Sequence, residues 1–215
     1  MNLENIFKFI GDKRGYQTPL LYKLIEEIPL TEEDLTVNGD LYLSRLVSQF
    51  KIPDNLTVNG NLNLIWAEHK SLPKNLHVKG DLDVRYSQIA TIPDDLKVDG
   101  SLYLSGSKVE TLPENFKVGK NLTIRDTRIK KIPNNLHIGG SLNMMGLTID
   151  SLPDNLHVNG KLDATYTTFT TIPNNLYVGE YINLGDSKLA KYYNQEQINK
   201  KIEDKGGQVN GKIFI

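Results

Sequence analysis

The chain has 215 residues, of which 39% are hydrophobic and 24% are charged, and its formal net charge is −1. A nearly neutral chain gives no overall electrostatic reason for binding nucleic acid or an anionic membrane. Because the sequence contains no cysteine, disulfides, thiolate zinc sites and cysteine nucleophiles are excluded, which fits a reducing compartment.

The first fifteen residues, MNLENIFKFIGDKRG, predict no secretory leader, because they contain an acidic residue and too short an apolar run. No stretch of the sequence approaches the ~18 apolar residues of a membrane-spanning helix. We therefore expect a cytoplasmic protein that does not associate with a membrane. Short helices are predicted over residues 3–10 and 17–27, where they would cover the first repeat, with Pro19 near the start of the second helix.

A repeat of 20 residues dominates the rest of the chain. Seven of the nine prolines recur at this period, at positions 53, 73, 93, 113, 133, 153 and 173. The consensus around them is (I/L)-P-x-N-L-x-V-x-G-x-L-x-L-x-x-(S/T)-x-I-x-x. Such a period is typical of a solenoid, in which each coil packs only on its neighbours and stacking builds one continuous core.

Strict alternation in V-x-G-x-L-x-L predicts a strand with one buried face, and stacking of the coils predicts a parallel sheet. The inward columns are expected to begin with Val37, Leu41 and Leu56 and to repeat in every coil. The recurring proline and asparagine are interpreted as structural, since asparagine side chains bond to the backbone in turns.

The period fails after Ser187, and a terminal cap is predicted there. A helix is expected from an Asn194 cap to a Gly206 stop, with Ile198 and Ile202 on one face. The segment VNGKIFI, residues 209–215, then repeats the strand motif. This gives nine strands, starting near residues 37, 58, 78, 98, 118, 138, 158, 178 and 209.

The segment L-x-L-x-x-(S/T)-x-I-x-x-L-P resembles the leucine-rich repeat in its short bacterial form, over about residues 35–190. It is similar to the substrate-recognition repeats of secreted ubiquitin-ligase effectors and to repeat proteins of bacteria and phages. The usual asparagine of that repeat is replaced here by Ser or Thr, for example Ser87 and Thr127. Those ligases use a catalytic cysteine, which this chain lacks, so the resemblance does not imply ligase activity.

The predicted fold class is an α/β repeat solenoid, with a leucine-rich-repeat-like parallel sheet of about nine strands and helical caps at both ends. The alternative is a β-helix without horseshoe curvature. The predicted domains are an N-terminal helical cap (1–34), the repeat solenoid (35–190) and a C-terminal helix with a final strand (191–215).

Catalytic motifs are absent from the sequence: there is no H-E-x-x-H, G-x-S-x-G or phosphate-binding loop. His77, His137 and His157 share one column, but no third metal ligand recurs with them. Asp83 and Asp163 are separated by four coils, roughly 19 Å at the spacing of paired strands, which is too far for two carboxylates to act on one glycosidic bond. We expect no enzyme activity, no cofactor and no metal.

The segment NLIWAEHKSLP, residues 63–73, breaks the repeat most strongly. It holds the single tryptophan, Trp66, and it places His69 in a column that is otherwise apolar. Departures from a consistent pattern are expected where there is function or strain, and Tyr, Trp and Arg are enriched in binding hot spots. The predicted partner-binding residues are Tyr42, Arg45, Asn63, Ile65, Trp66, Asp83, Arg85, Tyr86 and Tyr103. Alternatively, Trp66 and His69 only adapt the first coils to the N-terminal cap.

The predicted function is that of a non-catalytic interaction module, which binds a protein partner and occludes or scaffolds it. From the resemblance, one setting is a phage or bacterial regulator of a host protein, which would act in the host cytoplasm if a phage encodes it. We expect a monomer unless the sheet ends assemble, and no nucleic-acid partner, since the basic residues concentrate in a single coil. The alternatives are a carbohydrate-active or carbohydrate-binding β-helix and a structural component of a larger assembly.

Overall fold

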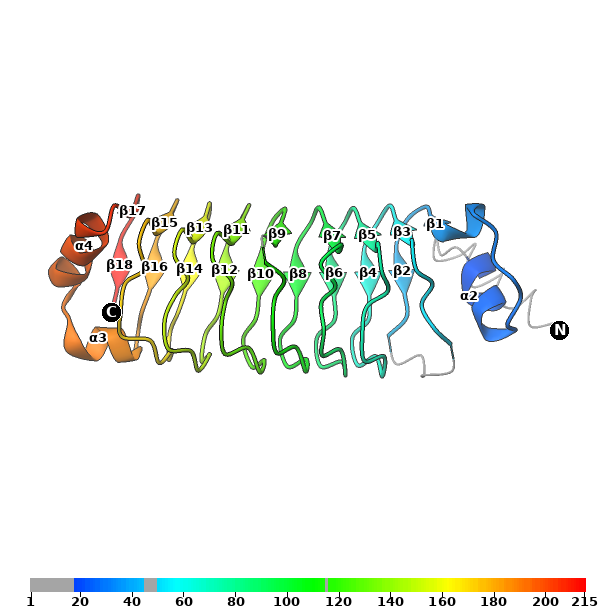
Figure 1. The fold of residues 1–215 in the computed structure, drawn as a ribbon, viewed down its shortest axis with the longest axis horizontal. Helices are drawn as coiled ribbons and strands as arrows, with labels where there is room; N and C mark the ends of the chain where they lie inside the picture. Colours follow the sequence, from blue (N-terminus) through cyan, green and yellow to red (C-terminus); the bar gives the residue numbers. More distant parts are fainter. Residues whose placement is uncertain (1–17, 45–49, 115) are drawn as a thin grey trace.

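A computed structural model describes residues 18–44, 50–114 and 116–215. The repeats form a parallel β-solenoid, in which coils stack along a straight axis and carry short strands on two adjacent sides (Figure 1). The predicted parallel-strand repeat solenoid is therefore confirmed. A straight stack of this kind is also what the β-helix alternative describes.

One side of the solenoid is a nine-stranded parallel sheet, here called the main sheet. Each strand pairs in register with the equivalent strand of the next coil, as Leu62 pairs with Leu82. The predicted parallel sheet of about nine strands is thus confirmed. The strands are β2 (Leu41–Tyr42), β4 (Leu62–Asn63), β6 (Leu82–Asp83), β8 (Leu102–Tyr103), β10 (Leu122–Thr123), β12 (Leu142–Asn143), β14 (Leu162–Asp163), β16 (Ile182–Asn183) and β18 (Ile213–Phe214).

The adjacent side carries a second row of strands, which is divided into a four-stranded and a five-stranded sheet. The first contains β1 (Thr36–Val37), β3 (Thr57–Val58), β5 (His77–Val78) and β7 (Lys97–Val98). The second contains β9 (Lys117–Val118), β11 (His137–Ile138), β13 (His157–Val158), β15 (Tyr177–Val178) and β17 (Gln208–Val209). The prediction of one continuous strand over V-x-G-x-L-x-L is therefore wrong, because the chain turns a corner between Val and Leu.

Close packing at this corner explains the recurring glycine. A Cβ added to Gly80 would lie only 2.7 Å from the carbonyl carbon of Gly60 in the coil before it, so no side chain fits there. In several coils the next residue connects the coils by hydrogen bonds: Asn61 Oδ1 accepts the N–H of Asp81, and Asp81 Oδ1 accepts the N–H of Ser101, both at 2.7 Å. The corner thus satisfies backbone donors while the chain changes direction.

The core consists of the predicted inward columns. Val58, Leu62 and Leu56 have no exposed surface, and their equivalents in the coils between Leu76 and Ile182 are also buried. At the outer corner, Asn55, Asn75, Asn135, Asn155 and Asn175 all have positive φ, which asparagine tolerates better than most residues. Their side chains also bond from coil to coil: the Asn75 amide donates to Asn55 Oδ1 at 2.9 Å. These asparagines therefore form a ladder along the solenoid. In a leucine-rich repeat the recurring asparagine stands at a different position, which Ser87 and its equivalents occupy in this chain.

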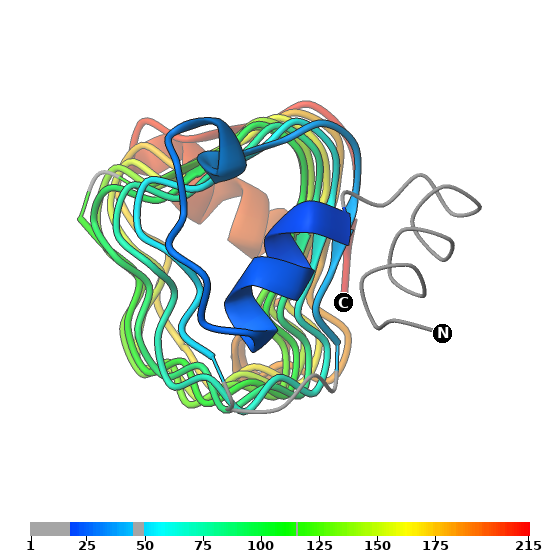
Figure 2. The same cartoon turned by 90° about the vertical axis from the view of Figure 1, so that its right-hand side faces the viewer.

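Helices cover both ends of the stack. Helix α2 (Thr18–Ile25) lies across the first coil and buries Leu20 (Figure 2), and a short 3-10 helix, η1 (Glu33–Leu35), follows it. The Lys23 ammonium lies 2.7 Å from Asp34 and, by this hydrogen bond first of all, lowers the pKa of that carboxyl to about 2. The helix predicted over residues 3–10 lies outside the described residues.

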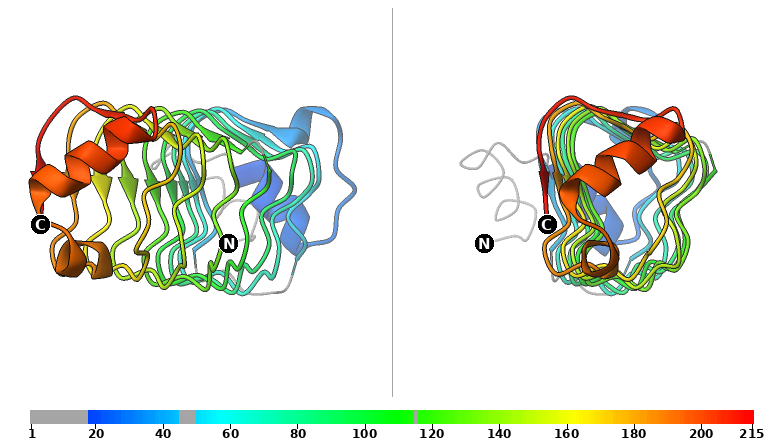
Figure 3. Two further views of the ribbon diagram at one scale, coloured as in Figure 1. Left: turned by 60° about the vertical axis from the view of Figure 1, so that its left-hand side comes forward. Right: turned by 90° about the vertical axis from the view of Figure 1, so that its left-hand side faces the viewer.

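The C-terminal end carries α3 (Lys188–Tyr192) and α4 (Gln195–Asp204), and α4 crosses the last coil (Figure 3). The predicted Asn194 cap is confirmed as a capping box with Gln197, and Ile198 and Ile202 are buried. The chain then returns as β17 and β18, which complete the final rung. Among the helices of the described residues, none has the length and apolar character needed to cross a bilayer.

The register of the main sheet predicts that substitution of two neighbouring residues changes the free energy of unfolding by very different amounts. Leu122 is fully buried, whereas Thr123 is partly exposed on the outer face. Leu122→Ala should lower the free energy of unfolding by about 2–5 kcal/mol through lost burial and a cavity. Thr123→Ala should change it by less than about 1 kcal/mol. Urea denaturation of both variants tests this, and equal losses would mean that the register is wrong.

Candidate functional site

A turn follows each strand of the main sheet from β4 to β16, and its third residue forms a column with an unusual backbone. In the second coil the turn is closed by the N–H of Ala67, which donates to the carbonyl of Leu64 at 3.0 Å. The third residue has φ near +60°, as in a type II turn, which favours glycine or asparagine there. This left-handed column comprises Trp66, Tyr86, Gly106, Asp126, Gly146, Tyr166 and Asp186.

Aromatic residues are poorly suited to this column. A residue with a Cβ in the left-handed conformation loses about 1–2 kcal/mol relative to the right-handed one. Trp66, Tyr86 and Tyr166 adopt it nevertheless, and they are 52%, 45% and 60% exposed, so burial of the rings offsets little of this strain. Strained residues that gain little burial are candidates for function.

Two of these aromatic residues stack on one another. The Trp66 and Tyr86 rings have centroids 4.8 Å apart and planes inclined by only 17°. The Tyr86 ring in turn lies over Gly106, where an added Cβ would be 2.5 Å from Tyr86 Cδ1. We call the set formed by Trp66, Tyr86 and Gly106 the aromatic stack, in which Tyr86 lies between Trp66 and Gly106. The rings are thus held side by side before any ligand is present.

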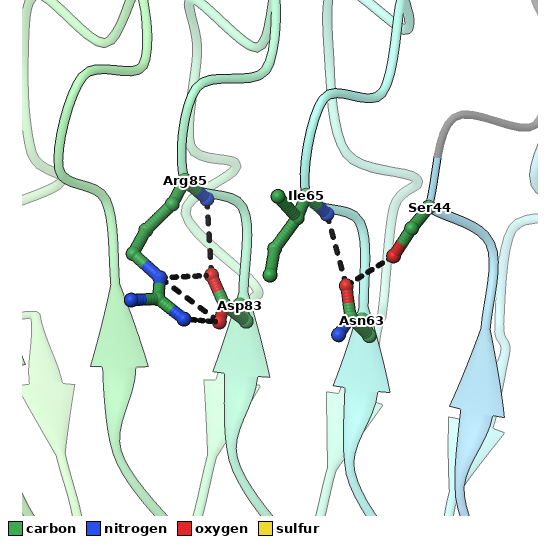
Figure 4. Close-up of polar contacts among 5 residues, drawn as sticks. All are labelled: Ser44, Asn63, Ile65, Asp83 and Arg85. Carbon is green, nitrogen blue, oxygen red and sulfur yellow. Dashed lines mark hydrogen bonds and ion pairs between the residues drawn. The ribbon is translucent and has the colours of Figure 1, made fainter.

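A charged group borders the aromatic stack on the main sheet. Arg85 Nη2 donates to Asp83 Oδ2 at 2.6 Å (Figure 4). The guanidinium also lies 5.6 Å from the centroid of the Tyr103 ring. The hydrogen bond to Asp83 is the main reason why the pKa of Arg85 is raised. The guanidinium is therefore fixed in place, with part of its surface exposed beside Tyr86.

Asp83 and Asn63 have a structural role at the ends of their strands. Asp83 Oδ1 accepts the backbone N–H of Arg85 at 3.1 Å, and Asn63 Oδ1 accepts that of Ile65 at the same distance (Figure 4). Asn63 is also hydrogen-bonded to the Ser44 hydroxyl. Because Asn143, Asp163 and Asn183 make the same turn contact in other coils, these side chains shape the turn rather than mark a special site.

The structure brings most of the predicted partner-binding residues onto one face. The expectation that Trp66 faces solvent is confirmed, and Tyr42 is 42% exposed with its hydroxyl donating to Asp40 Oδ2 at 3.2 Å. Ile65 is partly buried beside Trp66. Arg45 lies outside the described residues. That this face binds a partner stays a prediction.

His69 is only partly buried in its otherwise apolar column, and it interacts with the preceding coil. Its Nε2–H donates to the carbonyl of Phe50 at 2.9 Å, and the two rings lie 5.8 Å apart. Its buried Nδ1 has no hydrogen-bond partner in the part of the chain that the structure describes. His69 thus belongs to the junction with the preceding coil, whereas Trp66 belongs to the aromatic stack. That either residue adapts the coils to the N-terminal cap stays a prediction.

The second row carries another ring stack. His137 and His157 have centroids 4.5 Å apart, and Tyr177 continues the stack 4.3 Å from His157. Within the described ranges no group of three or more potential metal ligands comes together. The pKa of His137 is lowered from 6.5, first by burial and then by His157 and Lys117.

Comparisons of the chain with protein-family models, with curated proteins and with solved structures find no match. Membership of the leucine-rich-repeat family therefore stays a prediction from the sequence motif. Function has to be inferred from the chemistry of the described residues.

Two glycines of the left-handed column provide a matched test of the aromatic stack. Gly106→Ala and Gly146→Ala should each lower the free energy of unfolding by about 1–2 kcal/mol, because both place a Cβ at positive φ. Only Gly106→Ala should shift the Tyr86 ring, since nothing lies within 4 Å of a Cβ at Gly146. The emission spectrum of Trp66 should therefore change in Gly106→Ala alone. An equal change in both variants would contradict the stack.

The lowered pKa of His137 predicts a dependence of stability on pH. Well above pH 6.5 the residue is neutral in both the folded and the unfolded chain. As the pH falls below this value, the unfolded chain takes up the proton first, so the free energy of unfolding decreases until the folded state is protonated as well. Urea denaturation between about pH 5 and pH 8 should show a smaller decrease in His137→Gln. The same decrease in wild type and variant would contradict the prediction.

Proposed function

We propose that the chain is a non-catalytic interaction module whose partner protein contacts the aromatic stack and the adjoining Arg85 on the main sheet. The observation that carries the proposal is the pair Trp66 and Tyr86, which is exposed, strained and stacked. Trp, Tyr and Arg are enriched among the hot-spot residues of protein interfaces.

The mechanism of binding would be that of a rigid template. Stacking on Gly106 and the ion pair to Asp83 order Tyr86 and Arg85 in the free protein. Side chains that are already ordered lose little conformational entropy on binding, so more of the contact energy remains as affinity. The bound partner would then be occluded or scaffolded. We further propose, from the sequence alone, that the protein acts in the cytoplasm. If a phage encodes it, the cytoplasm would be that of the host cell, where the protein would regulate a host protein.

Trp66→Gly separates binding from folding. Relief of the left-handed strain, about 1–2 kcal/mol, should offset the lost stacking of about 0.5–1.5 kcal/mol, so the stability should change by less than about 1 kcal/mol. Partner affinity should fall by about 2 kcal/mol or more, roughly 30-fold. The measurement is capture from a lysate of the source cells, followed by titration of the captured protein.

Tyr166→Gly is the matched control, because Tyr166 has the same turn position, φ of 58° and high exposure, but lies four coils from Tyr86. A partner that wild type and Tyr166→Gly retain and Trp66→Gly loses would support the proposal. Equal retention by all three proteins would show that the aromatic stack is not the binding site.

The carbohydrate-binding alternative has one observation in its favour, namely that exposed Trp and Tyr rings also offer apolar faces to sugars. It predicts that oligosaccharides quench or shift the emission of Trp66 in a saturable way. If an oligosaccharide is the ligand, Trp66→Gly should lose oligosaccharide binding and Tyr166→Gly should retain it. If a protein is the ligand, the same difference should appear for that protein and not for oligosaccharides. The assembly alternative would instead give oligomers whose size depends on concentration.

A further inference from the structure

Asparagine is followed by glycine four times in the chain, and two of these pairs have identical neighbours. The sequence Val-Asn-Gly-Lys stands at residues 158–161 and again at residues 209–212. In such a pair the glycine nitrogen can attack the side-chain amide of the asparagine, because glycine has no side chain to hinder the approach. Since the two tetrapeptides are the same, any difference in their reactivity has to come from the fold.

The pair Asn159–Gly160 lies inside the stack, where hydrogen bonds between coils hold the glycine. The Gly160 N–H donates to the carbonyl of Gly140 at 2.8 Å, and the Gly160 carbonyl accepts the N–H of Glu180 at 3.1 Å. Gly60, which follows another of the four asparagines, forms the same two bonds. A nitrogen that is held toward its acceptor cannot reach the preceding amide until this part of the stack opens. The stack therefore protects the interior pairs.

The pair Asn210–Gly211 lies in the final rung, between β17 and β18, and lacks this protection. Among the residues that the structure describes, none accepts the Gly211 N–H and none donates to the Gly211 carbonyl. Asn210 and Gly211 are both exposed, whereas Gly160 is buried. A hollow of about 290 Å³ lies beside the pair and gives water access to it. The Gly211 nitrogen is thus free to react.

Two side chains contact the amide of Asn210. Gln208 Nε2–H donates to Asn210 Oδ1 at 2.6 Å. A donor at this oxygen stabilises the negative charge that forms on it when a nucleophile adds to the amide carbon. On the other side, Asn210 Nδ2 donates to Tyr177 Oη at 3.3 Å. The Tyr177 hydroxyl therefore lies at the nitrogen that would leave, where it can give a proton to the departing ammonia.

We propose that Asn210 is a site of spontaneous deamidation, at which Gln208 and Tyr177 assist the reaction. The Gly211 nitrogen gives up its proton and bonds to Asn210 Cγ, the Cγ–Nδ2 bond breaks, and ammonia leaves, which closes a succinimide ring. Water then opens the ring at either carbonyl and yields aspartate or isoaspartate. The whole reaction consumes water and releases ammonia, so it needs no other reactant. It is independent of the binding proposed for the aromatic stack.

The modification would act on the C-terminal end of the stack. Isoaspartate places an additional carbon in the main chain, directly after the N–H of residue 210, which donates to the carbonyl of Val178 at 3.0 Å. The chain between β17 and β18 would then no longer match the preceding coil in length. Because a solenoid is held together by contacts between neighbouring coils, the modified final rung should open more readily than the rest of the stack.

Peptide mapping by mass spectrometry, after incubation of the folded full chain at mildly alkaline pH, tests the proposal. Asn159 is the internal comparison: it is also exposed, and its Oδ1 is also hydrogen-bonded, to His157 Nε2 at 2.8 Å. Deamidation should be at least about tenfold faster at Asn210, because the Gly160 N–H must first be released. In concentrated urea the two rates should be equal. Equal rates in the folded chain would overturn the proposal.

Gln208→Ala and Tyr177→Phe test the assistance by these two side chains. Each substitution should slow deamidation of Asn210 in the folded chain by about two- to tenfold, the value of one hydrogen bond. Tyr177→Phe retains the ring that stacks on His157, 4.3 Å away, and removes only the hydroxyl. A substitution that merely loosened the final rung would accelerate the reaction. Unchanged or faster deamidation in both variants would therefore contradict the proposed roles.

Discussion

The whole structure depends on hydrogen bonding in register between successive coils. The N–H groups of Leu62, Leu82 and Leu102 donate to the next coil at 2.9, 2.9 and 2.8 Å, and the same bond recurs along the main sheet. Because each two-residue strand pairs with its equivalent in the next coil, 20 residues away within the regular repeats, a sequence position of the repeat becomes a column in space. No coil could satisfy its backbone or bury its leucines alone, so stability arises between neighbours.

This constraint explains why a few departures from the repeat stand out on the surface. The backbone of the left-handed column is fixed by the turn in each coil from Trp66 to Asp186, whatever residue occupies it. Gly106 and Gly146 fit that backbone without strain, whereas Trp66 and Tyr86 adopt it at a cost and gain little burial. In return the fixed turn aligns the two rings face to face. A regular scaffold thus positions irregular residues, which is the physical basis of the proposed binding site at the aromatic stack.

The columns of the core could be predicted from the sequence, because alternation and period report burial directly. Leu122 and its equivalents are buried as the pattern requires. The corner within V-x-G-x-L-x-L could not be predicted in this way. One continuous strand and two short strands joined by a corner both bury every second residue, so they give the same pattern of apolar residues. Only the approach of Gly80 to Gly60 reveals that the chain turns there. The cap at Asn194 was predictable because capping residues act locally.

The candidate site was predictable as a set of residues but not as a geometry. The outward column that contains Trp66 could be predicted from the repeat. Glycine and aspartate recur in this column, and both are typical of positive φ, but reasoning from the alternation of apolar residues did not use this indication. The stacking of Tyr86 on Gly106 depends on the direction in which the rings lean, and no sequence pattern encodes it. Asn63 and Asp83 were predicted as binding residues, whereas the structure gives them turn contacts that recur elsewhere.

The central claim is that the aromatic stack is already formed in the free protein. Proton NMR of the free chain tests it most directly, through the Gly106 Hα resonance and contacts between the Trp66 and Tyr86 rings. The structure predicts nuclear Overhauser effects between the two rings and a Gly106 Hα resonance shifted upfield by the Tyr86 ring above it. A Gly106 Hα resonance at its ordinary position, with no contact between the rings, would contradict the account.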